Sequence, residues 1–307
     1  MRHNLISLLF IVLVAACNKD NEIIIDNPED DNPPLIKVDA IPLSVLEYLP
    51  APGQYINEAV SGFDNISTMQ EACTQAQNRL LENQYVSLGA WGGQIIVGLE
   101  TPVLNSGSYD FGIAGNTFDS SNEPGIVWVM TDSNKDGVPN EEWYELKGSY
   151  FMQEGYQRDF WVTYSRPESG QNTPWIDSDG ESGFVNWMGS YHNQDYYYPA
   201  WVEEDSYTLH GSKLPCRAYQ DPVTNLWGNK AYEWGYVDNS GSDLKEVSYN
   251  GTDILINNFK ISDAIDADGK PVKIEKIDFI KVQTAIMGSA GILGENSTEV
   301  CGFFRYL

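Results

Sequence analysis

"GQIIVGLE", residues 93–100, is a short run of β-branched and large apolar residues that opens on a glycine. Runs of this length, bounded by turn-forming residues, predict a β-strand. Four similar runs lie further along the chain, at 125–131 (GIVWVMT), 159–164 (DFWVTY), 253–259 (DILINNF) and 277–284 (IDFIKVQT). Many short strands without alternating helices predict an all-β fold, either a β-sandwich or a jelly roll.

One segment departs from this pattern and predicts an amphipathic helix. Thr68 and Glu71 have the spacing of a capping box, which marks a helix start. An apolar stripe then follows on one helical face, formed by Met69, Ala72, Cys73, Ala76 and Leu80. Cys73 is therefore expected to be a small buried residue. The aromatic-rich stretch 165–250 is expected to form long loops that decorate a single domain covering residues 37–307.

The first residues predict export and lipid anchoring. Residues 1–16, MRHNLISLLFIVLVAA, have a basic start and an apolar run too short to span a bilayer, the layout of a signal peptide. Cys17 follows directly, as in a bacterial lipobox, and is the expected site of lipidation. Residues 17–36 are rich in Asp, Glu, Asn and Pro, the composition of a solvated linker. The chain is thus expected to contact a membrane through its lipid anchor only.

The charge balance limits the partners. A formal net charge of −26 repels nucleic acid and anionic lipid surfaces. It is compatible with cations and with neutral or cationic ligands. We therefore expect a small-molecule or glycan ligand and no nucleic acid.

A loop between two predicted strands resembles half of a calcium site. Asp132, Asn134, Asp136 and Asn140 fall at positions one, three, five and nine of such a loop, and the backbone carbonyl of Val138 falls at seven. Calcium takes six to eight hard oxygen ligands, which these groups supply. The EF-hand pattern fails, because position twelve is Trp143, so Glu142 or a distant acid would have to close the shell. The alternative is an Asx-rich turn that binds nothing.

Catalytic motifs are missing from the sequence. His192 and His210 have no zinc-binding spacing, and no nucleophile or nucleotide motif is present. A carboxylate pair for glycoside hydrolysis stays open, with Glu203, Glu204 and Glu233 as candidates among aromatic residues. The acidic stretch 175–183 (WIDSDGESG) is expected to be a solvated hairpin turn.

Aromatic residues are concentrated in two stretches, 186–202 and 227–236. Flat rings beside Asn, Gln and Asp suit sugars and other large ligands with polar and apolar faces. The expected ligand contacts are Trp187, Tyr191, Tyr197, Trp201, Trp227 and Trp234. The alternative is that these rings form the edge of an aromatic-rich sandwich. At least one of Tyr196, Tyr197 and Tyr198 should be exposed if this run is extended, since strand side chains alternate faces.

Several ordered blocks resemble a family of bacterial surface proteins. They are LPAPGQYINE (49–58), SLGAWGGQIIVGLETPVLN (87–105), DFGIAGNTFDSSNEPGIVWV (110–129) and DSNKDGVPNEEWYELKGS (132–149). This pattern is similar to cell-surface lipoproteins of Bacteroidetes. The resemblance implies a β-sandwich reminiscent of carbohydrate-binding modules. It also implies a place beside TonB-dependent outer-membrane uptake systems, including those for cobamides.

These observations together predict a lipid-anchored protein on the outer face of the outer membrane, which binds a glycan or a cobamide-like nutrient for uptake. Calcium is expected to be structural, and no catalytic residue is assigned. Two other classes stay open. One is a glycan-active hydrolase, and the other is an adhesin or an accessory subunit of a TonB-dependent transporter.

Overall fold

The computed structural model describes residues 35–307, and the stretch 93–100 lies in one of its longest strands. This strand, β4 (Gln94–Leu104), pairs with β2 on one side and β17 on the other. The complete sheet has the order β16-β7-β6-β17-β4-β2, with antiparallel pairing throughout. Its other strands are β2 (Leu43–Leu49), β6 (Gly125–Met130), β7 (Tyr144–Leu146), β16 (Ala264–Ile265) and β17 (Lys276–Thr284). The strands predicted at 93–100, 125–131 and 277–284 are confirmed.

A second sheet of five strands has the order β1-β19-β5-β15-β14. Its strands are β1 (Val38–Ala40), β5 (Phe111–Ala114), β14 (Leu244–Tyr249), β15 (Thr252–Phe259) and β19 (Gly302–Tyr306). This sheet brings the start and the end of the described chain together, because Val38 pairs with Tyr306. The strand predicted at 253–259 is β15 and is confirmed.

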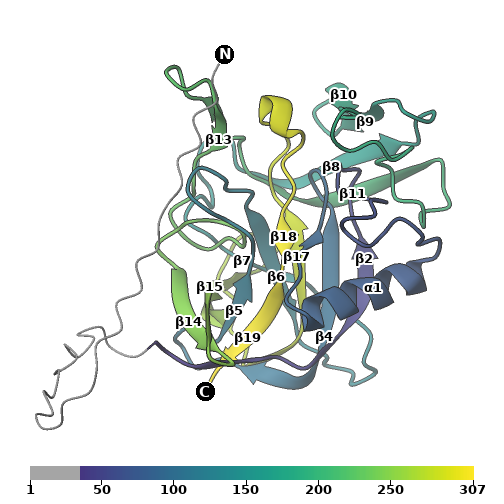
Figure 1. Ribbon diagram of the computed structural model, residues 1–307. Helices are drawn as coiled ribbons and strands as arrows, with labels where there is room; N and C mark the ends of the chain where they lie inside the picture. Colours follow the sequence, from purple (N-terminus) through teal and green to yellow (C-terminus); the bar gives the residue numbers. More distant parts are fainter. Residues whose placement is uncertain (1–34) are drawn as a thin grey trace, which may run out of the picture. The chain divides into compact units, whose positions relative to one another are not determined.

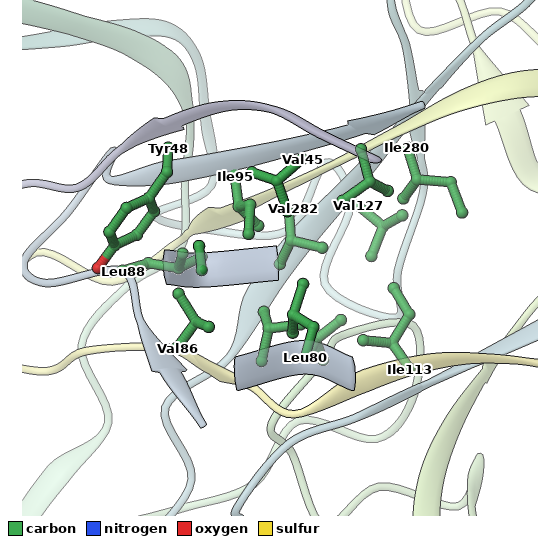
Figure 2. Close-up of a cluster of buried hydrophobic side chains, with 14 of the residues drawn as sticks. Val45, Tyr48, Leu80, Val86, Leu88, Ile95, Ile113, Val127, Ile280 and Val282 are labelled. Atoms are coloured by element: carbon green, nitrogen blue, oxygen red, sulfur yellow. The ribbon is translucent and has the colours of Figure 1, made fainter. Parts of the chain in front are cut away.

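The two sheets contribute side chains to one hydrophobic core. Val127, Ile280 and Val282 come from the six-stranded sheet, and Ile113 comes from the five-stranded sheet (Figure 2). All four are fully buried. Burial of apolar surface on this scale is the main favourable term in folding, so this shared core holds the two sheets together.

The predicted helix is present as α1 (Met69–Leu81). Thr68 accepts a hydrogen bond from the Glu71 N–H, and the Glu71 side chain accepts one from the Thr68 N–H, so the capping box is complete. Cys73 is buried on the inner face. The helix packs beside β2 (Figure 1), where the Gln77 side chain accepts a hydrogen bond from the Val45 N–H.

The stretch 165–250 contains more strands than the expected long loops. A four-stranded sheet has the order β10-β9-β8-β11, and two shorter ladders join β12 to β13 and β3 to β18. The strands are β3 (Val86–Ser87), β8 (Gln157–Ser165), β9 (Thr173–Asp177), β10 (Ser182–Val185), β11 (Ser206–Lys213), β12 (Ala218–Gln220), β13 (Trp227–Asn229) and β18 (Glu299–Val300). β8 contains the strand predicted at 159–164, and β3 and β18 lie outside the stretch 165–250. Of the others, β9, β10, β11 and β13 carry Gly, Pro or Asp, so they lack a clear apolar alternation. The expected hairpin at 175–183 is confirmed as β9 and β10.

Residues 35–307 are therefore predominantly β, with 40% strand and a single α-helix in the described part of the chain. Two short 3-10 turns, η1 (Ile261–Asp263) and η2 (Gly291–Leu293), complete the elements. No helix in the described range is long and apolar enough to cross a membrane. The predicted signal peptide, Cys17 and nearly all of the linker lie outside the described residues.

Candidate functional site

The predicted calcium loop connects β6 to β7, two neighbouring antiparallel strands. Asp132 Oδ1 accepts the Lys135 N–H at 2.6 Å, and Oδ2 accepts the Gly137 N–H at 3.0 Å. The amides of Asn134 and Asn140 both lie 3.0 Å from Asp136 Oδ2. These contacts are those of an Asx-rich turn, in which the Asp132 oxygens accept backbone N–H groups and the amide N–H groups of Asn134 and Asn140 face Asp136. Carboxylate and amide oxygens are also hard donors of the kind that calcium takes.

Glu141 is hydrogen-bonded to the first half of the loop. Its Oε1 accepts the N–H groups of Ser133 and Asn134 at 2.9 and 3.1 Å. Its Oε2 is buried and has no hydrogen-bond partner within residues 35–307. Glu142, one of the acids that the sequence offers for closing a calcium shell, is exposed and accepts a hydrogen bond from the Tyr144 hydroxyl.

Two of the expected ligand contacts are core residues. Tyr197 and Trp201 are 1% and 3% exposed. The Trp201 ring stacks on Tyr48 with ring centroids 5.6 Å apart, and its indole N–H donates to the Tyr48 carbonyl. The Tyr197 hydroxyl donates to the His192 carbonyl. This corrects the expectation that these two side chains contact a ligand on the surface.

The other four aromatic candidates do not converge on one site. Tyr191 is 75% exposed. Trp187 packs against the core, and its indole N–H donates to the Gln194 carbonyl. Trp227 and Trp234 line separate clefts. The aromatic stretches therefore do not form one continuous binding face.

A cleft of about 860 Å³ gathers aromatic residues from other parts of the chain. Its aromatic lining consists of Trp91, Tyr156, Tyr164, Trp175 and Phe184. We call it the aromatic cleft. Trp175 and Phe184 lie on the β9–β10 hairpin, where Trp175 pairs with Gly183. A Cβ at residue 183 would approach Trp175 Cζ2 to 2.5 Å, so glycine lets the indole lie against the neighbouring strand.

Two residues that line the aromatic cleft, Trp91 and Glu295, carry buried polar atoms without partners. Trp91 Nε1 and Glu295 Oε2 form no hydrogen bond to any described residue. The other Glu295 oxygen, Oε1, accepts the Gln54 N–H at 2.7 Å. Burial raises the pKa of Glu295 to about 7. An unpaired buried polar group costs about 1–3 kcal/mol, so such groups indicate where a ligand or water supplies the missing partner.

A second cleft, of about 460 Å³, shares Glu295 with the first. We call it the acidic cleft. Its lining includes Tyr55, Phe118, Trp227 and three acids, Glu123, Glu295 and Glu299. The segment 287–295, yellow in Figure 1, contributes residues to both clefts. The two clefts therefore share this short segment as part of their lining.

Three carboxylates meet at the acidic cleft: Glu123, Asp238 and Glu299. One oxygen atom from each lies within 4.8 Å of the others. Asp238 Oδ1 accepts the Asn116 N–H and Oδ2 accepts the Glu299 N–H, both at 3.0 Å. Glu123 Oε1 accepts the Ser297 N–H at 3.1 Å. Burial, and then the neighbouring Asp238, raise the pKa of Glu123 to about 8, and burial raises that of Asp238 to about 7.

The acids suggested by the sequence for hydrolysis lie elsewhere. Glu203, Glu204 and Glu233 are exposed and line neither cleft. His192 Nδ1 lies 2.6 Å from Glu58 Oε1, also outside both clefts. Sequence reasoning missed the carboxylate cluster because its members are separated by more than sixty residues. A left-handed φ of 58° at Asp238 marks the position only once the fold is known.

Comparisons with models of protein families and with curated protein sequences give no match for this chain. The clefts and the loop are therefore the features of the molecule that bear on its function.

Proposed function

We propose that this protein captures a neutral or cationic, hydroxyl-rich ligand in the aromatic cleft. The observation that carries the proposal is the lining of this cleft, which includes Trp175 and Phe184 together with Trp91 and Glu295, two residues that carry buried polar atoms without partners. Aromatic faces stack on sugar rings and other flat ligands, while a few polar groups fix their orientation. A volume of about 860 Å³ lies within the usual range for small-molecule sites.

The proposed setting is the outer surface of a bacterial outer membrane. Lipid on Cys17 would hold the domain there, and the acidic linker would keep it in solvent. A glycan or a cobamide-like nutrient would be passed to a TonB-dependent transporter. The two larger sheets, with their shared core, support a β-sandwich of the jelly-roll kind as the scaffold.

A calcium ion in the loop between β6 and β7 is part of this proposal. Asp132, Asn134, Asp136, Asn140 and the Val138 carbonyl are the candidate ligands, with Glu141 closing the shell. The ion would brace the connection between two strands of the larger sheet. Its role is structural, because the loop lines neither the aromatic nor the acidic cleft.

A glycan-active hydrolase is the second candidate. Glu123, Asp238 and Glu299 bring carboxylate oxygens within 4.8 Å of one another, and glycosidases act through a pair of neighbouring Asp or Glu side chains. Release of reducing sugar from a glycan, lost in Glu123→Gln, would favour this candidate over binding alone.

Binding calorimetry of the full-length chain against a panel of glycans and cobamides tests the proposal. Trp175→Ala should weaken binding about tenfold or more, because truncating an aromatic anchor costs about 2 kcal/mol. Tyr191→Ala is the matched control, since Tyr191 is exposed and lies outside both clefts. Its affinity should equal that of the wild type.

Two results would contradict the proposal. Unchanged affinity in Trp175→Ala, with loss in Tyr191→Ala, would move the site to the aromatic stretch at 186–202. No binding to any member of the panel would favour an adhesin or an accessory subunit of a transporter.

A further inference from the structure

The three carboxylates of the acidic cleft come from three distant segments. Glu123 precedes β6, Asp238 lies in the segment before β14, and Glu299 begins β18. The fold nonetheless places one oxygen of each within 4.8 Å of the other two. Backbone hydrogen bonds to Glu123 and Asp238 hold these side chains in place. The cluster is therefore built by the fold and is not a chance group of surface acids.

An unpartnered buried atom in the cluster indicates a missing ligand. Glu299 is 2% exposed, and its Oε1 has no hydrogen-bond partner among residues 35–307. Asn229 is 4% exposed and lines the same cleft, and its Oδ1 also has no hydrogen-bond partner among these residues. The amide oxygen of Asn229 is an acceptor only, and so is the Glu299 oxygen when its carboxyl group is ionised, so each needs a hydrogen-bond donor or a cation as its partner.

No basic side chain pairs with the cluster within the described part of the chain. None of the salt bridges formed by residues 35–307 includes Glu123, Asp238 or Glu299. Buried carboxylates in proteins are normally paired or coordinate a metal. A bound cation would relieve the mutual repulsion of the three groups.

The donor set favours calcium over other metals. All three ligands are carboxylate oxygens, which are hard donors, and no His or Cys belongs to the cluster. One oxygen of each acid lies within 4.8 Å of the other two, so a single cation can contact all three. Calcium accepts such a partial protein shell and completes its six to eight ligands with other oxygens, whereas magnesium demands near-ideal octahedral geometry.

We propose that Glu123, Asp238 and Glu299 bind a calcium ion at the acidic cleft, separate from the loop between β6 and β7. The ion ties together three segments that line or support the cleft. Because Glu123 and Glu299 line it, coordination positions not taken by the protein are left for water or for ligand hydroxyl groups.

Counting bound calcium in the full-length chain tests this site. After equilibrium dialysis against calcium, Glu123→Gln and Glu299→Gln should each hold one ion fewer per chain than the wild type. Asp136→Asn should lose the loop ion and keep this one, so the double variant with Glu123→Gln loses both. Glu100→Gln is the matched control, because Glu100 is exposed and lies outside the clefts. Its ion count should equal that of the wild type.

Equal ion counts in wild type, Glu123→Gln and Glu299→Gln would overturn the proposal. If the substitutions prevent folding, anomalous diffraction from wild-type crystals soaked in terbium chloride decides the question. An anomalous peak between the three carboxylates supports the site. Clear electron density for the three side chains with no anomalous peak between them rejects it. Ligand capture in the aromatic cleft is measured separately, so failure of one proposal leaves the other standing.

Discussion

At the residue scale, the sequence shows which residue types are present but not which way their side chains point. Tyr196 is 36% exposed, whereas Tyr197 and Tyr198 are buried. This agrees with the expectation that at least one of the three reaches solvent. The choice of Tyr197 and Trp201 as ligand contacts was wrong because both pack into the core, where aromatic rings contribute large buried areas.

Trp201→Ala should therefore act on stability. Removing a buried indole from its stack on Tyr48 leaves a cavity and should lower the free energy of unfolding by about 3–5 kcal/mol. Tyr191→Ala, at an exposed position, should change it by about 0.5 kcal/mol or less. Urea denaturation measures both. Equal effects of the two substitutions would contradict the assignment of Trp201 to the core.

Glu295 should make stability depend on pH. Its pKa is about 7 in the folded chain against an ordinary value of 4.5, so the folded state binds more protons between these limits. The contribution of this group to the free energy of unfolding is therefore fully present below about pH 4.5. It falls by up to about 3 kcal/mol as the pH rises to 7. In Glu295→Gln this contribution should vanish. Urea denaturation at pH 5 and pH 8 in EDTA checks the difference, and an identical pH response in both proteins would refute it.

At the element scale, local signals were sufficient for the helix and for the long central strands. The capping box at Thr68 and the apolar runs of β4, β6 and β17 are local patterns, which predict these elements without knowledge of the segments they pack against. Apart from the hairpin at 175–183, the strands in 165–250 were missed, because they lack a clear apolar alternation. β11 also depends on a distant partner, since it pairs with β8 in a register that runs from Ser206 with Ser165 to Lys213 with Gln157.

The loop between β6 and β7 could be predicted as a candidate calcium loop, since the residues with ligand-type side chains lie close together in the sequence. Calcium should raise the melting temperature of the wild type, because binding to the folded state alone stabilises it. In Asp132→Asn the rise should be smaller. Asp268→Asn should respond like the wild type, because Asp268 is an exposed acid in a different turn, paired with Lys270. Thermal melts in calcium and in EDTA provide the comparison, and equal rises in Asp132→Asn and wild type would argue against the loop site.

At the scale of the whole molecule, neither cleft could be predicted from sequence. Residues 91, 175, 184 and 295 meet in the aromatic cleft only because the four-stranded sheet and the segment 287–295 lie beside each other. The carboxylate cluster likewise joins residues from three segments. Composition could predict that aromatic and acidic groups would matter, but their grouping is a property of the fold.

The central claim is that the aromatic cleft binds the ligand. Hydroxyl-radical footprinting of the full-length chain, with and without a glycan or cobamide that binds in calorimetry, tests it most directly. Ligand should reduce oxidation of Trp175 and Phe184 and leave that of the exposed Tyr191 unchanged. Reduced oxidation of Tyr191, with none at Trp175 or Phe184, would contradict the account.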